Sequence, residues 1–401
     1  MRVLIYSHDS FGLGHLRRCR RIAHALVGAD KNLTALIISG SPIIGSFDFR
    51  ARVDFVRVPG VVKLRNGNYT PLNLLIDIEE TLDLRASIIQ HTALAFAPDL
   101  FLVDKEPLGL GGEVEPALRR LKQRGTRLVL GLREVMDSPD RLQAEWARKH
   151  VMPALRELYD EIWVYGPEGF HDPLEGLAMP AAVRDKLVFT GFQRTTAPAE
   201  RAGPTEPPTR EPYVLVTAGG GGDGADLIDW VLSAYESDPA IPLAPVFLFG
   251  PFMDADRRES FSDRVRALGR GAALEFEAAP EYLMTGAQAI VCMGGYNTFC
   301  EMLSFDKPAL MVPRTEPREE QLVRARRAAA LGLVDMRVYE EDASPATMVQ
   351  ALRGLAWRRP PSEVLPAGWM DGLDVIARRV SGERAVAPDA PTTLAAQVGG
   401  G

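Results

Sequence analysis

The sequence predicts an α/β protein in which two Rossmann-like domains face a central cleft. Its 401 residues favour two domains over one. Short apolar runs alternate with amphipathic stretches along the chain, a pattern typical of parallel sheets covered by helices. Both halves also open in the same order, with an apolar strand, a glycine-rich loop and a helix, which indicates a weak internal repeat.

The first half begins with an apolar run at residues 3–7, as expected for a parallel strand buried on both faces. A glycine turn leads into a helix expected at about residues 16–27. Residues 71–96 predict one long helix, because apolar side chains recur on one broad face. The other strands of this half are similarly short and apolar, and they are expected at residues 33–39, 53–58, 99–103, 127–131, 161–165 and 186–190.

A proline-rich segment separates the two halves. Residues 198–212 contain five prolines and few apolar side chains, which favours a linker. The second half opens with a strand at 214–217, a glycine-rich loop at 219–224 and a helix that ends near residue 235. Its other strands are expected at residues 246–249, 273–276, 289–292 and 309–312.

These patterns divide the chain into five segments. The first domain covers residues 1–197, residues 198–212 link it to the second, and the second domain covers residues 213–365. Residues 366–384 carry a last helix. Residues 385–401 are rich in Ala, Pro, Thr and Gly without periodicity, which predicts a disordered tail.

Composition excludes several classes of function. The net charge of −7 provides no overall basic field for nucleic acid. The three cysteines lack CxxC spacing, which argues against a disulfide framework or a zinc site and favours a reducing cytosol. We expect neither a signal peptide nor a membrane-spanning helix, because the first apolar run is short and no run reaches eighteen residues.

The first glycine-rich loop places a histidine at a helix start. Gly12 and Gly14 permit a tight turn after the strand, and His15 then projects at the carboxyl edge of the sheet, where open α/β folds bind ligands. A helix N-terminus favours the neutral imidazole that a general base needs. The alternative is that His15 only caps the helix or packs.

Other charged residues are expected to lie at the same sheet edge as His15 or on the helix that carries it. Asp104 and the pair Arg133–Glu134 directly follow predicted strands, with Asp137 nearby, so all should lie at the same edge. Asp104 could orient His15 or take a proton itself, and each acid could equally cap a helix or form an ion pair. The first helix is basic, with Arg17, Arg18, Arg20 and Arg21, which suits phosphates, an anionic membrane surface or a solvated face.

The second half carries two glycine-rich strand ends. Glycines at 219–224 and at Gly294–Gly295 allow backbone N–H groups to face an anion. Asp223 would repel a pyrophosphate, so we expect it to cap the next helix. Asn297 or Thr298 is expected to cap the helix that carries Glu301, whose carboxylate could accept hydrogen bonds from a ribose diol. The alternative is an ordinary βαβ unit with a glycine turn.

Residues 12–18, 219–224 and 291–325 together resemble the motifs of GT-B glycosyltransferases, most closely the MurG-like, family 28-type branch. The resemblance implies that the first domain faces the acceptor, that the second binds a nucleotide-sugar donor, and that the last helix packs back onto the first domain. The 219–224 loop departs from the family, whose members usually carry a serine among these glycines.

The resemblance also assigns roles to individual residues. It implies that His15 and Asp104 are catalytic, and that Arg17, Arg18, Arg133 and Glu134 lie on the acceptor or phosphate side. The base is expected near 276–279, the ribose at Glu301 and the sugar hydroxyls at Glu320 and Gln321, although Glu320 could be an exposed helix acid. The implied donor-binding residues are Gly14, Gly219, Gly220, Gly221, Phe276, Glu277, Gly294, Gly295, Tyr296, Asn297, Thr298, Glu301, Glu320 and Gln321.

The implied activity is an inverting transfer of a sugar from a nucleotide diphosphate, with UDP the expected nucleotide, to a hydroxyl acceptor, without metal or other cofactor. The acceptor could be a sugar, a lipid-linked molecule or a small molecule. No nucleic-acid partner is expected, and a cytoplasmic location leaves peripheral contact with the inner face of the membrane open. A UDP-sugar hydrolase of the same fold and a non-catalytic nucleotide-sugar-binding protein are the alternatives.

Overall fold

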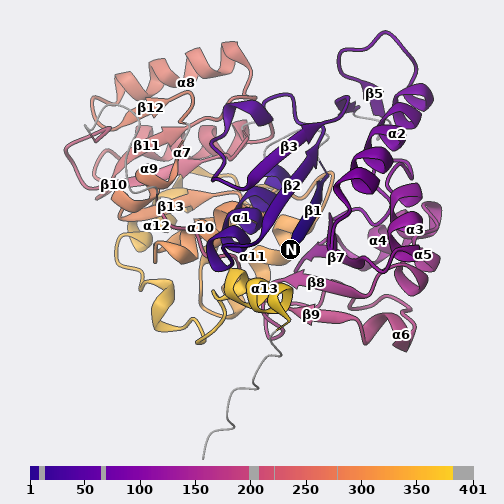
Figure 1. Ribbon diagram of the computed structural model, residues 1–401. Helices are drawn as coiled ribbons and strands as arrows, with labels where there is room; N and C mark the ends of the chain where they lie inside the picture. Colours follow the sequence, from indigo (N-terminus) through magenta and orange to yellow (C-terminus); the bar gives the residue numbers. More distant parts are fainter. Residues whose placement is uncertain (9–13, 65–68, 198–206, 221, 278, 383–401) are drawn as a thin grey trace, which may run out of the picture.

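The computed structural model describes residues 1–8, 14–64, 69–197, 207–220, 222–277 and 279–382. It contains two separate parallel sheets, each covered by helices (Figure 1). The predicted α/β fold with two such units is therefore confirmed. Most of the predicted linker and all of the predicted tail fall outside the described residues.

The first sheet has seven parallel strands in the order β3-β2-β1-β6-β7-β8-β9. Every predicted strand of the first half is found within one or two residues. The inner strands are short apolar runs with mostly buried side chains, whereas the edge strands β3 and β9 are only partly buried. The strands are β1 Arg2–Ser7, β2 Thr34–Ser39, β3 Val53–Arg57, β6 Leu100–Asp104, β7 Arg127–Arg133, β8 Glu161–Tyr165 and β9 Leu187–Phe189.

The prediction of one helix over 71–96 was wrong at its start. The helix α2 covers Ile78–Phe96, and Asp77 caps it by accepting a hydrogen bond from the Glu80 backbone N–H while Glu80 reaches back to Asp77. This capping box fixes the first turn at residue 78. Upstream, β4 (Val61–Lys63) and β5 (Tyr69–Pro71) form an antiparallel pair that the sequence did not reveal. Leu75, an apolar residue within the range of the predicted helix, is fully exposed.

The other helices of the first unit pack on the two faces of its sheet (Figure 1). They are α1 Gly14–Ala29, α3 Glu115–Gln123, α4 Pro139–Arg148, α5 Val151–Glu157 and α6 Ala181–Arg184, with a short 3-10 turn at Ile44–Ser46.

The second sheet has six parallel strands in the order β12-β11-β10-β13-β14-β15. Its strands are β10 Tyr213–Thr217, β11 Ala244–Leu248, β12 Ala272–Leu274, β13 Ala289–Cys292, β14 Ala309–Met311 and β15 Asp335–Met336. Its helices are α7 Ala225–Ser237, α8 Ala255–Ala267, α9 Glu281–Gly286, α10 Tyr296–Ser304, α11 Glu320–Ala330 and α12 Pro345–Leu355, followed by a 3-10 turn at Pro361–Glu363.

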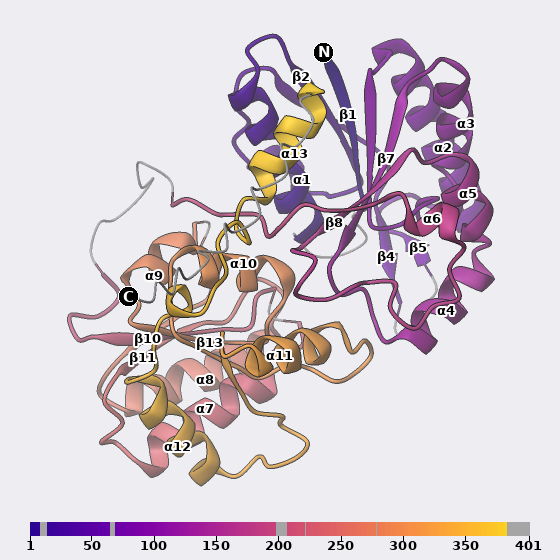
Figure 2. The same ribbon diagram turned by 90° about the horizontal axis from the view of Figure 1, so that it is seen from below.

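The chain returns to the first unit at its end. Helix α13 (Gly372–Ser381) lies against α1 (Figure 2). The Gly372 backbone N–H donates to the Phe192 carbonyl oxygen at 3.0 Å, and residues 193 and 371 form a β-bridge. A Cβ at Gly372 would lie only 2.4 Å from the Gly191 carbonyl oxygen, so this close crossing requires glycine.

An apolar contact also joins the two units. Phe299 of α10 packs against Phe170 and Phe192 of the first unit, with ring centroids 5.6 and 5.3 Å apart. Trp369 contacts the same two first-unit rings from the returning segment. The three cysteines, Cys19, Cys292 and Cys300, are free and buried. Among the described residues no helix is long and apolar enough to cross a membrane.

Candidate active site

His15 and Asp104 meet where two adjacent strands of the first sheet end. His15 lies in the first turn of α1, after β1, and Asp104 is the last residue of β6, which pairs with β1. The His15 Nδ1 and Asp104 Oδ2 atoms are 2.6 Å apart. Asp104 is completely buried, whereas 19% of the His15 side chain remains exposed. The sequence-predicted pair is therefore assembled, with the imidazole as its accessible member.

Arg18 completes a buried trio one helical turn after His15. Its Nε donates to Asp104 Oδ1 at 2.9 Å and its Nη2 donates to Asp104 Oδ2 at 2.7 Å, a bidentate arrangement. Only 2% of the Arg18 side chain is exposed. Because this guanidinium is committed to Asp104, it is not presented to a membrane surface, and its contact with a phosphate is not supported by this geometry.

The hydrogen-bond pattern assigns the histidine tautomer. The Asp104 carboxylate can only accept, so His15 Nδ1 carries the proton and donates to it. The Arg18 Nη2 atom also lies 2.8 Å from His15 Nδ1, but both groups then point N–H bonds toward Asp104 Oδ2. Nε2 of His15 is left with a free lone pair, which is what a general base requires.

Burial and charge set the protonation states of this trio. Burial lowers the pKa of His15 to about 4, and the hydrogen bond from His15 to Asp104 opposes this only in part. Burial alone would raise the pKa of Asp104, but the Arg18 charge and the His15 hydrogen bond outweigh it and hold that pKa well below its usual range. At neutral pH the pair is a neutral imidazole beside a carboxylate.

The second unit brings a helix N-terminus to the same place. Helix α10 begins at Tyr296, and the Asn297 Nδ2 atom donates to the Gly14 carbonyl oxygen at 3.0 Å. The prediction that Asn297 or Thr298 caps this helix was wrong. The cap is Gly295, two residues before Asn297, and it has no side chain. The Asn297 amide is used across the boundary instead. The starts of α1 and α10 therefore lie side by side.

Gly294 illustrates why a glycine pair stands before α10. Its φ angle is +78°, and a Cβ there would lie 1.9 Å from the Met311 methyl carbon. Its carbonyl oxygen accepts a hydrogen bond from Arg324 Nη1 at 3.0 Å. The turn is thus fixed by packing against β14 and by one buried arginine.

The other glycine loop follows β10. Gly219 has φ +65°, and a Cβ on the neighbouring Gly250 would lie 2.5 Å from the Gly219 carbonyl oxygen, so the two backbones approach closely. Gly220 follows in this loop, and Gly221 lies outside the described residues. The prediction that Asp223 caps the next helix was wrong, because Gly224 is the cap and Asp223 pairs with Arg314.

Glu301, expected at the ribose, is held by the first unit. Its Oε1 atom accepts from Arg17 Nη2 at 2.9 Å and from Arg21 Nη2 at 3.3 Å, and Arg17 also contacts Glu281 at 2.7 Å. Only 1% of Glu301 is exposed. Burial raises its pKa, with the two arginines opposing the shift. A ribose could reach this carboxylate only if the two arginines gave way.

Glu320 and Gln321, expected at the sugar hydroxyls, begin α11 and are buried. Glu320 pairs with Arg133 of β7 and lies 3.4 Å from Arg314 Nη2. Burial would raise its pKa, but the Arg133 charge and other nearby cations lower it far below the usual range. Gln321 Oε1 accepts from the Arg314 backbone N–H at 3.2 Å. The exposed-acid alternative for Glu320 was wrong.

Glu134 is also paired across the boundary. It is completely buried, and its Oε1 accepts from Arg324 Nε of α11. Tyr296 is buried between Arg18 and Arg324, whose guanidinium carbons lie 5.5 and 5.9 Å from its ring centroid. Thr298 follows in α10 and is partly exposed.

The remaining predicted donor residues lie at the edge of the second sheet. Phe276 follows β12 and is 57% exposed, and Glu277 accepts a hydrogen bond from the Ala279 backbone N–H at 3.0 Å.

Three residues at the carboxyl edge of the first sheet were missed as functional candidates. His8, Lys105 and Glu106 directly follow β1 and β6, and they are 2%, 8% and 4% exposed. Their position after two adjacent strands could have revealed them, as it did His15 and Asp104. The positive φ angle of Lys105, +68°, could not be predicted from the local sequence pattern.

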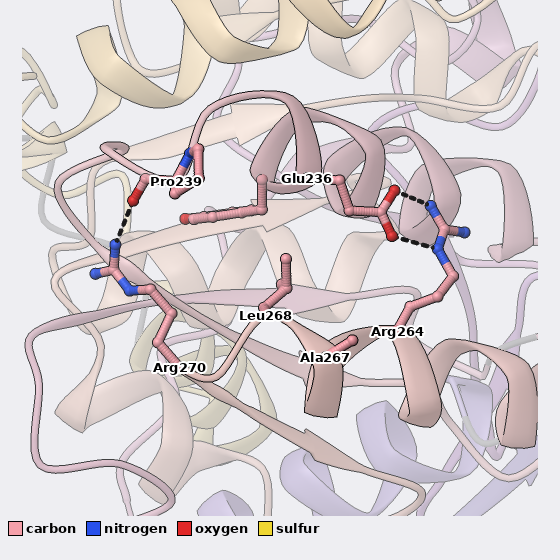
Figure 3. Close-up of a pocket in the computed structure, with 7 residues that line it drawn as sticks. Glu236, Pro239, Arg264, Ala267, Leu268 and Arg270 are labelled. Atoms are coloured by element: carbon pink, nitrogen blue, oxygen red, sulfur yellow. Dashed lines mark hydrogen bonds and ion pairs between the residues drawn. The ribbon is translucent and has the colours of Figure 1, made fainter.

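A separate pocket lies away from these residues. It is lined by Tyr235 and Glu236 of α7 and by Arg264, Leu268 and Arg270 at the end of α8 and beyond (Figure 3). Arg264 pairs with Glu236, and Arg270 donates to the Pro239 carbonyl oxygen at 3.2 Å, so both guanidinium groups are already engaged. We assign no function to this pocket.

Residues 214–360 match the model of the glycosyltransferase family 28 C-terminal domain. No curated protein sequence matches the chain. Solved structures similar to it include TcCGT1 in complex with UDP, at 14% identity and a TM-score of 0.64 over 95% of this chain and 99% of that one. MurG of Acinetobacter baumannii is 13% identical, with a TM-score of 0.58 over 94% of this chain and 99% of that one.

The fold is that of the GT-B glycosyltransferases. Its second unit matches the model of the family 28 C-terminal domain, which confirms the predicted resemblance to GT-B, family 28-type proteins. The same fold also includes UDP-GlcNAc 2-epimerase of Neisseria meningitidis bound to UDP-GlcNAc, at 14% identity and a TM-score of 0.58 over 95% of this chain and all of that one. The GT-B fold therefore leaves the reaction to be argued from the site.

Proposed function

We propose that this protein is an inverting glycosyltransferase that moves a sugar from a nucleoside diphosphate, UDP in our proposal, to a hydroxyl acceptor without a metal ion. One observation carries the proposal. The neutral His15 imidazole, oriented by Asp104, lies at the start of α1, and the start of α10 in the family 28 domain touches that same turn through Asn297 and Gly14. A base and an anion-binding helix end are thus adjacent.

In the proposed reaction, His15 Nε2 takes the proton of the acceptor hydroxyl. The acceptor oxygen attacks the anomeric carbon as the bond from that carbon to the β-phosphate oxygen breaks, and the nucleoside diphosphate leaves. Asp104 stabilises the imidazolium that forms, because its carboxylate accepts the Nδ1 proton and remains ionised. Attack opposite the leaving group inverts the configuration of the anomeric carbon.

The leaving diphosphate needs positive charge and N–H donors. We propose that the backbone of the Gly219–Gly220 loop and the N-terminus of α10 supply the donors, since free N–H groups at a helix start attract anions. We propose that Arg314, which pairs with Asp223 beside that loop, exchanges this partner for the diphosphate. These groups would do the work that a metal ion does in other transferases.

Nucleotide release tests this proposal directly. The protein would be incubated with UDP-glucose, UDP-galactose and UDP-N-acetylglucosamine without acceptor, while UDP release and the thermal shift are recorded in parallel. Binding of one UDP-sugar with negligible release supports a transferase. Failure to bind any of these sugars, or UDP itself, would remove the proposed donor.

Hydrolysis is the second candidate, because the His15–Asp104 pair would activate water as readily as an alcohol. Rapid stoichiometric release of UDP and free sugar in the same assay would favour it. Retention of binding with no turnover on any acceptor would favour the non-catalytic nucleotide-sugar-binding protein.

A further inference from the structure

A buried polar cluster lies beside the proposed base and takes no part in the mechanism above. It consists of His8, Lys105 and Glu106, which follow β1 and β6 at the carboxyl edge of the first sheet. The ring centroids of His8 and His15 are 5.4 Å apart and the rings meet edge to face. A substrate whose reacting group lies at His15 would therefore place its neighbouring groups against this cluster.

Ion pairs extend the cluster to the boundary between the units. Lys105 Nζ lies 3.2 Å from Glu106 Oε1, and Lys149 Nζ donates to Glu106 Oε2 at 2.6 Å. Lys149 also contacts Glu145 at 2.9 Å, and Arg318 of the second unit reaches Glu145 at 3.1 Å. Arg318 thus closes the cluster from the opposite side.

The charges in this cluster nearly cancel. Three cations, Lys105, Lys149 and Arg318, face two carboxylates, Glu106 and Glu145, and Asp137 lies 3.8 Å from Arg318. Such a set offers strong donors and strong acceptors together. It suits a neutral ligand that both donates and accepts hydrogen bonds better than it suits an ion.

Two features of the cluster cost free energy. Lys105 holds a left-handed φ of +68°, which is unfavourable for a residue other than glycine. The Nδ1 atom of His8 is buried without a hydrogen-bond partner among the described residues, although nearly all buried polar atoms in native proteins have one. Strain and unmet hydrogen bonds of this kind concentrate where a ligand binds.

We propose that His8, Lys105 and Glu106 bind the hydroxyls that neighbour the nucleophilic hydroxyl of a sugar acceptor. This inference rests on the proposed transferase function and names its acceptor class. The Lys105 ammonium donates to one hydroxyl oxygen, the Glu106 carboxylate accepts from another, and His8 Nδ1 gains the partner that it lacks. The acceptor enters while Arg318 is withdrawn and is enclosed when the two units meet.

The competing acceptor classes fit the cluster less well. A flat apolar aglycone would leave His8 Nδ1 without a partner and would offer no hydrogen bond to Lys105 or Glu106. A phosphate or carboxylate would meet Glu106 and Glu145 together with cations that are already paired with them. The hydroxyls of a sugar both donate and accept hydrogen bonds, so a sugar can bind the donors and the acceptors of the cluster together.

The acceptor class can be tested with matched pairs of compounds. The donor that binds best in the release assay would be offered with octyl β-glucoside, octyl β-galactoside and octyl N-acetylglucosaminide, and separately with 1-octanol and p-nitrophenol. Mass spectrometry would identify the products, and saturation-transfer NMR with UDP present would detect binding of each compound. We expect transfer to, or binding of, at least one glycoside and none for octanol or p-nitrophenol.

Two substitutions locate the effect. Glu106→Gln and Lys105→Met should each raise the KM for the preferred glycoside at least tenfold and leave the Kd for UDP unchanged, which also reports that the variants are folded. Lys122→Met, at an exposed pair with Asp160, is the matched control and should leave both constants unchanged.

The possible failures point to different parts of the argument. A wild-type protein that binds no UDP-sugar overturns the transferase function itself. A protein that binds the donor but neither binds nor modifies a glycoside, or that glycosylates p-nitrophenol in preference, overturns the acceptor inference alone. An unchanged glycoside KM in both variants overturns the assignment to His8, Lys105 and Glu106.

Discussion

The two units end their strands with different chemistry. At the edge of the first sheet stand titratable side chains, namely His8, Asp104, Lys105, Glu106 and Glu134, nearly all of them buried. At the corresponding edge of the second sheet the chain passes through glycines, namely Gly219, Gly220, Gly222, Gly250, Gly294 and Gly295. The same fold is thus equipped on one side for proton transfer and polar recognition, and on the other for close approach of backbone to an anion.

Charged side chains that the second unit brings to the boundary form ion pairs with charged side chains of the first unit. Glu301 is held by Arg17 and Arg21, Glu320 by Arg133, and Arg324 by Glu134. A set of ion pairs therefore joins the two units where they touch. Substitutions can separate the pairs that hold the units together from the groups that act on substrate.

The largest effect on stability is expected at the completely buried pair Glu134–Arg324. Arg324→Ala would leave Glu134 as an unpaired buried charge, and we expect the free energy of unfolding to fall by about 3–5 kcal/mol. Urea denaturation measures this change. The double variant Glu134→Leu with Arg324→Met should recover most of the loss, and a single variant as stable as the wild type would show that the pair contributes little.

His15→Ala tests the charged edge itself. Loss of the general base should reduce kcat by about 100-fold or more, while the Kd for the nucleotide sugar stays the same. His24→Ala, on the same helix, is the control and should retain activity. Near-normal turnover of the His15 variant would mean that this edge does not supply the base.

The pH dependence of the reaction sharpens the role of Arg18. A His15 pKa of about 4 means that the imidazole stays neutral, and kcat/KM stays level, as the pH falls through 6.5 toward that value. Arg18→Gln removes a positive charge that lowers this pKa, so the acid limb should move upward by roughly one pH unit. An acid limb near pH 6.5 in the wild type would show that burial does not control this histidine.

The smallest expected effect concerns Glu301. Glu301→Ala should weaken UDP binding by roughly fivefold to tenfold if its carboxylate serves the ribose once Arg17 and Arg21 have moved. Isothermal titration with UDP gives the Kd. An unchanged Kd would instead leave Glu301 as a structural contact between the two units, like Glu134.

Local sequence pattern was sufficient for the sheets and for the first pair of site residues. Most strands of the two parallel sheets are apolar runs, whereas β4, β5 and β15 are not and were not predicted. His15 and Asp104 lie at the ends of strands that are adjacent in the sheet, so their meeting could be expected from topology. Pattern failed where a single side chain decided the outcome. The Asp77 capping box moved the start of α2, and the Asn297 amide was used for Gly14 rather than as a cap.

The pairings across the boundary had no signal in the sequence at all. Arg17 and Glu301 are 284 positions apart, and Arg133 and Glu320 are 187 apart. An arginine on the first helix reads equally well as a solvated charge, a phosphate ligand or a partner for a distant carboxylate. Only the relative placement of the two units distinguishes these roles.

The returning helix α13 has a mechanical consequence. The chain passes between the units twice, once after β9 and once before α13, and the bridge between Gln193 and Asp371 ties the two passages together. A single passage would act as a tether, about which the second unit could swivel in any direction. We expect two bonded passages to restrict the second unit to fewer directions of movement, so that the same two edges meet each time the units come together.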